Sequence, residues 1–282
     1  MLAVPETRST IRRRPRLGVV KFASCDGCQL TLLDLEDDLL AIADRVDIVE
    51  FAEATSKRSS GPFDILFVEG SISTPEQAGE IVRLRAVTST LVTIGACATA
   101  GGVQALRNWA DHDAVRSLVY PNPEFVESLA TATPVAEHVA VDAELRGCPI
   151  SPEQLREFVT ATLAGRRPNL PDEAVCVECK RRNVVCVAVA EGLTCLGPVT
   201  RSGCGALCPT FGRGCYGCFG PREAANGGGL ATWFAQDRDA ADVARSFALF
   251  NAWSPPFRDV IDEAGGPPGP IDGGPIKEPS DA

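Results

Sequence analysis

Eight cysteines crowd into the stretch between Pro171 and Pro221, which is rich in glycine and has hardly any periodic apolar pattern. Such a stretch cannot bury a conventional hydrophobic core, so cross-links or bound metals must hold it together. The number of cysteines predicts two metal sites with four thiolates each. The residues concerned are Cys176, Cys179, Cys186, Cys195, Cys204, Cys208, Cys215 and Cys218.

Two kinds of metal site suit these cysteines. The C-x2-C pairs and the Cys-Pro step at Cys208 are typical of 4Fe-4S clusters of ferredoxin type. Structural zinc sites use the same pairs, although the irregular spacing between the pairs is unlike that of a zinc ribbon. The sequence leaves open which cysteine serves which site, because ferredoxin-like folds exchange a ligand between motifs.

The remaining composition indicates a cytoplasmic protein. A formal net charge of -10 argues against a nucleic-acid partner, which requires clustered Lys and Arg. There is no apolar run long enough to span a membrane. The Arg-rich segment "TIRRRPRL" is not followed by the apolar region and cleavage site of an export signal. In the cytoplasm thiols stay reduced, so we expect metal ligands rather than disulfides.

Apolar runs alternate with longer amphipathic stretches up to about Gly165. This alternation predicts an α/β fold with a parallel sheet and helices on both faces. A sheet of five strands favours a flavodoxin-like strand order. We predict strands at 17–22, 46–51, 65–68, 90–94 and 135–141, and helices at 30–43, 75–88, 103–118 and 152–164.

We expect the chain to divide into four segments. A flexible arm at 1–15 is followed by a flavodoxin-like domain with one metal site at 16–165. A cysteine-rich iron-sulfur domain at 166–262 follows, with helical spacing resuming over 230–250. The last segment, 263–282, is rich in Gly and Pro and is expected to be disordered.

The other four cysteines follow predicted strands. Cys25 and Cys28 come after the first strand, Cys97 after the fourth and Cys148 after the fifth. The carboxyl ends of parallel strands share one edge of the sheet, so we expect the four thiols to meet there. Sulfur ligation of this kind indicates an iron-sulfur cluster or zinc. The alternative is a set of unrelated buried cysteines, each packing as a small apolar side chain.

Glu69 and the two histidines are the further polar candidates for the site. Glu69 ends the third predicted strand on the same edge, where it would serve as a proton-relay or partner-contact carboxylate. An ordinary acid at a helix N-terminus is an equal alternative for this residue. The two histidines, His112 and His138, are not needed as ligands, because twelve cysteines already supply twelve positions.

Four motifs in this order resemble the small subunit of nickel-iron hydrogenases: "SCDGCQL", "VEGSI", "GACATAGGVQAL" and "GCPISPEQL". The resemblance runs from about Leu17 to Pro221. The cysteine-rich extension resembles that of the cytosolic, pyridine-nucleotide-linked branch, which includes the sulfhydrogenase delta subunits. The related 20 kDa subunit of respiratory NADH dehydrogenase has two adjacent cysteines in its cluster motif, and "CDGC" departs from that pattern.

The resemblance implies an electron-transfer subunit of an NAD(P)-linked hydrogenase with three 4Fe-4S clusters. Cys25, Cys28, Cys97 and Cys148 would hold the proximal cluster, and the other eight cysteines the medial and distal ones. Glu69 would lie near the interface with the large subunit. That large subunit carries the nickel-iron site, so this chain has no complete active site. FAD and NAD(P) would bind a diaphorase subunit, accompanied by a further iron-sulfur subunit.

The histidine ligand of the distal cluster and the signal peptide found in exported hydrogenases are missing here. No flavin or nicotinamide fingerprint is present either, because the glycines at Gly203 and Gly205 do not follow a strand. Two other functions remain open at this point. The chain could be the iron-sulfur subunit of an NADH dehydrogenase-like oxidoreductase, or a zinc-stabilised interaction module.

Overall fold

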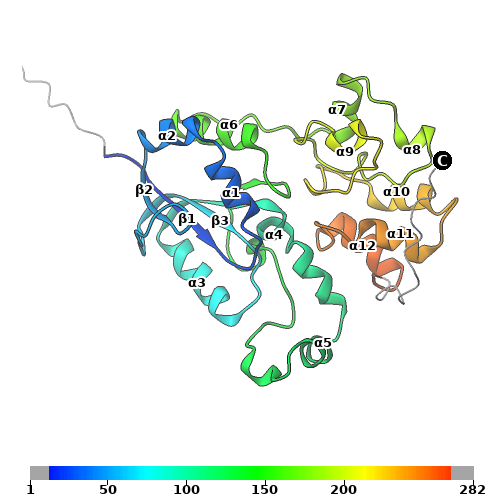
Figure 1. Cartoon of the computed structure of the whole chain (residues 1–282), viewed down its shortest axis with the longest axis horizontal. Helices are drawn as coiled ribbons and strands as arrows, with labels where there is room; N and C mark the ends of the chain where they lie inside the picture. The colour runs from blue at the N-terminus through cyan, green and yellow to red at the C-terminus, as the bar shows by residue number, and fades with distance from the viewer. Residues whose placement is uncertain (1–12, 268–282) are drawn as a thin grey trace, which may run out of the picture.

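The computed structural model describes residues 13–267. A sheet of five parallel strands forms the first part of the molecule (Figure 1), with the order β2-β1-β3-β4-β5. This order is the flavodoxin-like one, so the predicted fold class is confirmed. The strands are β1 (Arg16–Lys21), β2 (Asp47–Phe51), β3 (Phe63–Glu69), β4 (Thr88–Ile94) and β5 (Ala143–Leu145).

Helices cover both faces of this sheet, as the alternation of the sequence predicts. Phe67 and Val92 pack on one face with Phe158 of α6, whereas Leu66 and Leu91 pack on the other face with α3. The helices of this part are α1 (Gly27–Leu33), α2 (Asp37–Ala43), α3 (Pro75–Ala86), α4 (Gly95–Ala100), α5 (His112–Val119) and α6 (Pro152–Leu163), with 3-10 turns at Val103–Trp109, Pro123–Phe125 and Val135–Glu137.

The predicted fifth strand at 135–141 is wrong. The chain forms a 3-10 turn at Val135–Glu137, and strand pairing with β4 begins only near β5. Val135 is fully buried, and Val139 and Val141 pack against the same core cluster. Their apolar spacing therefore reflects packing beneath the sheet rather than strand pairing.

Two predicted helices are interrupted. The stretch 30–43 divides into α1 and α2 at Glu36, whose φ of 49° is incompatible with a helix. This break lets Leu35 join the core cluster that α1 and α2 cover. The stretch 103–118 is a 3-10 turn followed by α5, which starts at Asp111, where the carboxylate accepts backbone N–H groups of the first turn.

The cysteine-rich part consists of short helices joined by loops, beside three helices that supply its core (Figure 1). Phe234, Phe247 and Phe257 pack together there, with the last two rings 5.5 Å apart. The predicted helical stretch 230–250 is two helices, α10 and α11. The helices of this part are α7 (Val175–Arg181), α8 (Val187–Ala190), α9 (Leu207–Thr210), α10 (Gly227–Phe234), α11 (Ala240–Phe247) and α12 (Pro255–Glu263).

Helix α12 was not predicted, although the sequence carries a signal for it. Ser254 precedes two prolines, and Ser followed by Pro is a common start of a helix. Its buried residues Phe257, Val260 and Ile261 recur at helical spacing. The Gly and Pro content of the following residues hid this pattern. Of the predicted terminal segments, 1–12 and 268–282 lie outside the described residues, and the four-segment division stays a prediction.

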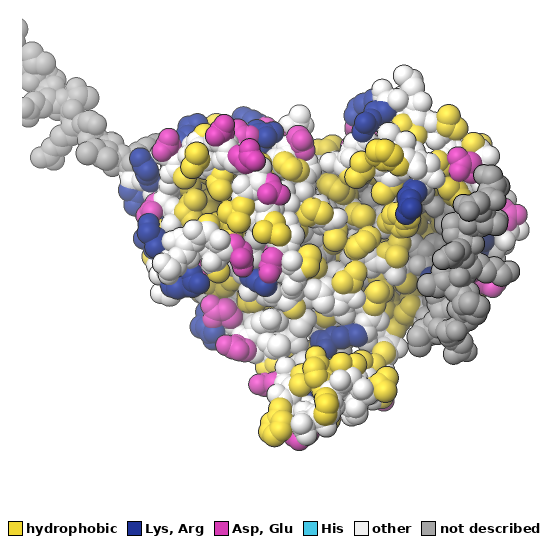
Figure 2. All heavy atoms as spheres, in the orientation of Figure 1, with side chains coloured by type: hydrophobic (Ala, Val, Ile, Leu, Met, Phe, Trp, Pro, Cys, Tyr) yellow, Lys and Arg dark blue, Asp and Glu magenta, His cyan; other side chains and the backbone are white. Residues whose placement is uncertain are grey.

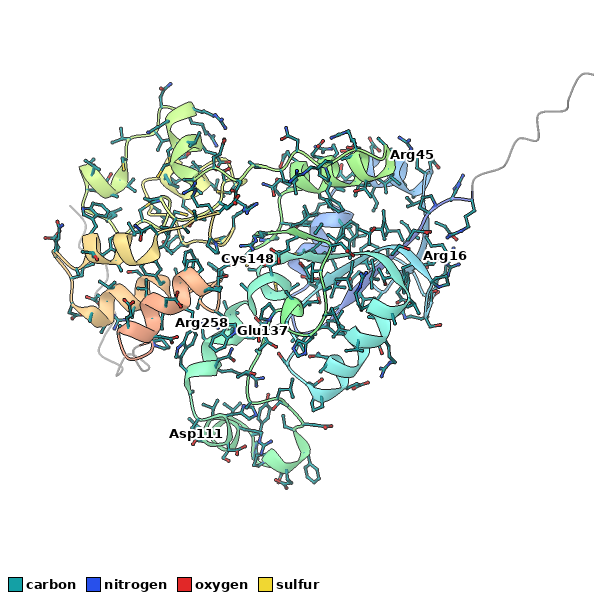
Figure 3. All side chains as sticks on the ribbon, turned by 180° about the vertical axis from the view of Figure 1, so that it is seen from behind. Arg16, Arg45, Asp111, Glu137, Cys148 and Arg258 are labelled. Carbon is teal, nitrogen blue, oxygen red and sulfur yellow. The ribbon has the colours of Figure 1, made fainter. Side chains whose placement is uncertain are left out.

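Aromatic side chains join the two parts of the molecule. Trp109 of the sheet part packs edge-on against Trp253, with ring centroids 5.1 Å apart. The Nε1 of Trp109 donates to Asp262 of α12 at 2.7 Å, and the Nε1 of Trp253 donates to Glu137 at 3.0 Å. Figure 3 shows Glu137 and Arg258 close together where α12 meets the first part. These contacts hold the cysteine-rich part at the carboxyl edge of the sheet.

The close approach of the backbone just after β1 and β3 gives a test of the fold. Gly70 has a φ of +97°, and a Cβ there would lie 2.6 Å from the carbonyl carbon of Phe22. We expect Gly70→Ala to lower the free energy of unfolding by about 3 kcal/mol, because backbone atoms cannot yield. Denaturant unfolding measures this. Gly79 occupies an exposed position of α3, so the control variant Gly79→Ala should stabilise the protein by about 0.5–1 kcal/mol. Equal stability of the two variants would contradict this close backbone approach.

Candidate metal centres

The first four cysteines come from three loops at the carboxyl edge of the sheet. Gly95, directly after β4, leaves room for the Sγ of Cys28, which a Cβ at this position would strike. A Cβ on Gly27 would lie 3.5 Å from the Sγ of Cys25 and 3.8 Å from Pro149, next to Cys148. The Ala96 N–H also donates to the Gly147 carbonyl at 2.7 Å. These close backbone approaches bring the loops after β1, β4 and β5 together.

The four thiols influence one another's pKa values. Burial raises the pKa of Cys28 well above its usual range, and the charges of Glu69, Cys97 and Cys148 raise it further. Burial also raises the pKa of Cys97 to about 11, with contributions from Cys148 and Cys25. Closely packed thiolates repel one another, so they need a positive partner to be ionised together. A bound metal supplies this charge, because coordination deprotonates a thiol outright.

Glu69 lies at the end of β3 and is 2% exposed. Its Oε1 accepts the backbone N–H of Cys28 at 3.1 Å, and its Oε2 accepts the Nε2 of Gln29 at 2.9 Å. Burial raises the pKa of this carboxyl, while the hydrogen bonds from Gln29 and Cys28 oppose the shift. These are the contacts of an acid at a helix N-terminus, and they hold the start of α1. A role at the large-subunit interface stays a prediction.

Two residues next to the cysteines were missed from the sequence. The Nε2 of Gln104 donates to the Ala23 carbonyl at 2.9 Å and lies 3.6 Å from the Sγ of Cys97. Gln104 thereby connects the first and fourth strand loops. Glu178 stands between Cys176 and Cys179 in "CVECK" and contacts the loop of Cys204. The sequence shows that each residue lies near a cysteine motif. It does not show what they contact, because the partners are in other segments of the chain.

Four of the C-terminal cysteines form a group around α7 and α8. Cys176 and Cys179 lie on α7, and Cys186 precedes α8. Burial raises the pKa of Cys176 to about 11, followed by the charges of Cys195, Cys179 and Cys186. The pKa of Cys179 is raised by burial and then by Cys195 and Cys186. A Cβ on Gly197 would lie 3.3 Å from the Sγ of Cys195 and 3.5 Å from the Sγ of Cys176, which places these two thiols close together.

The other four C-terminal cysteines lie between this group and the sheet. A cavity of about 690 Å³ is lined by Cys148 of the sheet part and by Cys204, Cys208, Cys215 and Cys218. Burial raises the pKa of Cys218 to about 12, and Cys148 is the largest charged contributor. Figure 3 shows Cys148 on the side of the sheet part that faces the cysteine-rich part.

The two C-terminal groups also touch each other. The Sγ of Cys195 accepts the backbone N–H of Cys215 at 3.2 Å. The spatial order is thus the sheet-edge group, the cavity group and the α7–α8 group. Figure 2 shows hydrophobic side chains gathered over the junction of the two parts, with charged side chains more frequent over the sheet part.

The donor set itself suits two kinds of metal. Four thiolates bind a structural zinc ion or an iron-sulfur cluster. In residues 13–267, no three His, Cys, Asp or Glu side chains are already arranged around a single metal ion.

The histidines take no part in these groups. The Nε2 of His112 lies 3.0 Å from the hydroxyl of Ser128, and the Nε2 of His138 lies 2.8 Å from the hydroxyl of Thr133. Both rings are thus engaged with a nearby hydroxyl. Among the described residues, no helix combines the length and apolar character needed to cross a membrane.

Similarity to known proteins agrees with this geometry. The family model for the 20 kDa subunit of NADH ubiquinone oxidoreductase matches residues 25–162. The delta subunit of sulfhydrogenase 2 from Pyrococcus furiosus is 35% identical over 84% of this chain and 100% of its own length. The G subunit of the F420-non-reducing hydrogenase Vhu from Methanococcus voltae is 31% identical, covering 86% of this chain and 95% of its own length.

A solved structure gives the same result. One chain in the crystal structure of an NAD+-reducing nickel-iron hydrogenase in the H2-reduced state is 30% identical to this chain. The match has a TM-score of 0.53 and covers 56% of this chain and 96% of that chain. The resemblance inferred from the four motifs is confirmed. This chain belongs to the family of nickel-iron hydrogenase small subunits, and it is the electron-transfer small subunit of such an enzyme.

Proposed function

We propose that this chain carries electrons through three 4Fe-4S clusters, between the nickel-iron site of a large subunit and a flavin- and NAD(P)-binding partner in the cytoplasm. The cavity shared by Cys148 and four C-terminal cysteines is the observation that carries this proposal. This cavity places a cysteine of the sheet edge and four cysteines of the cysteine-rich part around one space. Each cluster, when bound, supplies a one-electron redox centre.

Cys25, Cys28, Cys97 and Cys148 would hold the proximal cluster. Cys25 is exposed, whereas Cys28 is buried, so one side of this group opens to the surface. Leu30 of α1 is 50% exposed, and Val103, at the start of the 3-10 turn after α4, is 51% exposed. An exposed apolar rim beside an open metal centre suits contact with the large subunit.

Cys204, Cys208, Cys215 and Cys218 would hold the medial cluster, because they share the cavity with Cys148. Cys176, Cys179, Cys186 and Cys195 would then hold the distal cluster. Cys186 is exposed at the far end of the row, which suits electron transfer to a further iron-sulfur subunit or to the diaphorase. The protein's own part is to bury the thiols and present backbone N–H groups to the sulfur atoms, which tune the potentials.

The NAD(P) partner is supported by the relatives but is not the only acceptor they suggest. The matched solved structure is an NAD+-reducing hydrogenase, whereas the Methanococcus voltae relative belongs to an F420-non-reducing enzyme. Hydrogen-dependent NAD(P) reduction by the complex purified through this subunit tests the proposed acceptor, and the co-purified large subunit should contain nickel.

The proximal assignment is tested by Cys25→Ser. If three equal clusters are present, the anaerobically purified complex should lose about one third of the iron and acid-labile sulfide of this subunit. Ser24→Ala changes the preceding residue, and it should lose none. If the C25S variant kept its full iron content, or lost the signals of the two C-terminal clusters instead, the ligand assignment would be wrong.

The order of the relay is tested by comparing Cys204→Ser with Cys186→Ser in the complex. Both substitutions should abolish hydrogen-dependent NAD(P) reduction, because each removes one cluster from the proposed series of proximal, medial and distal clusters. Under hydrogen, EPR spectroscopy should still detect reduced proximal and medial clusters in C186S, but only a reduced proximal cluster in C204S. The opposite pattern would exchange the medial and distal assignments. Loss of hydrogen activation in both variants would contradict a separate nickel-iron site on the large subunit.

A further inference from the structure

A single carboxylate connects the two C-terminal cysteine groups. Glu178 lies on α7 between Cys176 and Cys179. Its Oε1 accepts the backbone N–H groups of Gly203 at 2.9 Å and Gly205 at 3.2 Å. Its Oε2 accepts the N–H of Ala206 at 3.1 Å. The helix of one cysteine group thus grips the loop of the other group through three hydrogen bonds.

The backbone of this loop is shaped around the carboxylate. Gly203, Gly205 and Ala206 have φ angles of +144°, +65° and +54°. A left-handed conformation costs a non-glycine residue roughly 1–2 kcal/mol, so Ala206 needs a compensating interaction. Successive N–H groups in such a turn form a concave anion-binding site, and here a side-chain carboxylate fills it.

A second contact from α7 reinforces this arrangement. The guanidinium of Arg182, one helical turn after Glu178, donates to the carbonyl of Gly205. Glu178 of α7 and Arg182, which caps this helix, therefore hold both N–H and C=O groups of the Cys204 loop. The Sγ of Cys204 lies 4.0 Å from the Oε2 of Glu178. The carboxylate of Glu178 therefore faces the sulfur of Cys204.

We propose that Glu178 is a positioning residue that orders the Cys204 loop and lowers the reduction potential of the cluster bound by Cys204, Cys208, Cys215 and Cys218. The inference rests on the proposed function, since it assumes that this group holds a cluster. The physical argument has two steps. A negative charge disfavours the added electron, and the three N–H groups that would stabilise the reduced state through sulfur are already occupied by the carboxylate.

The experiment is an EPR-monitored redox titration of the anaerobically purified complex containing Glu178→Gln. This substitution keeps the shape and one acceptor oxygen but removes the charge. We expect one cluster to rise in potential, so that its reduced-to-oxidised ratio at the original midpoint increases about tenfold, which corresponds to about 59 mV for a one-electron couple. The potential of the proximal cluster and the iron content should be unchanged.

Two further variants separate positioning from a general loss of charge. Glu178→Asp keeps the charge and should leave the potential closer to that of the unsubstituted protein. Glu191→Gln removes the same charge from an exposed residue of the same domain and should shift no cluster. If E178Q lost one cluster while E178D kept it, the assignment would still be supported, because the charged acceptor would then be what holds the loop.

Unchanged potentials in a fully loaded E178Q variant would overturn the assignment of Glu178 and leave the proposed function intact. Equal shifts in E178Q and E191Q would also overturn it, because the effect would then be a general one of charge. By contrast, if the unsubstituted complex contained no 4Fe-4S signals, the proposed function would fail, and this assignment would fail with it.

Discussion

Repulsion among buried thiolates is the constraint on which the rest of this structure depends. Burial raises the pKa of cysteines in all three groups, and the charges of neighbouring cysteines raise it further. A group of this kind is unfavourable as four free thiolates, yet no disulfide relieves it, because all twelve cysteines are free. Metal coordination turns the repulsion into binding energy, since the ligands must be deprotonated. Without a metal these buried cysteines stay protonated thiols, and coordination would supply the positive charge that lets them ionise together.

The parallel sheet and the aromatic contacts serve this arrangement. The sheet brings three strand ends to one edge, where glycine at position 95 leaves space for the Sγ of Cys28. The cysteine-rich part cannot dock by a core of its own cysteine loops, so it docks through Trp109, Trp253 and α12. This docking places Cys148 and the Cys204 group around one cavity. Contacts away from the cysteines thus help to bring Cys148 and the Cys204 group together.

Carboxylates hold cysteine loops in both parts of the molecule. Glu69 accepts the N–H of Cys28, and Glu178 accepts three N–H groups around Cys204. In each case a buried or half-buried acid satisfies backbone donors that a glycine-rich loop cannot pair internally. The same contact places negative charge near sulfur atoms. Under the proposed function, loop order and redox tuning would therefore have a common physical origin in this chain.

The sequence by itself determined the fold class, four of the five strands and the common edge of the first four cysteines. Periodicity and the order of elements carry this information locally, because each strand end lies next to its cysteine in the chain. Only the tertiary structure decided where the fifth strand lies, which C-terminal cysteines line a cavity with Cys148, and what Glu69 and Glu178 contact. The physical reason is that these features depend on contacts between segments distant in the chain. The apolar spacing around Val135 is the same for a strand and for a segment packed beneath the sheet, and only the structure tells them apart. Cys218 lies beside Cys148 because the two parts of the molecule dock, which its position in the chain does not indicate.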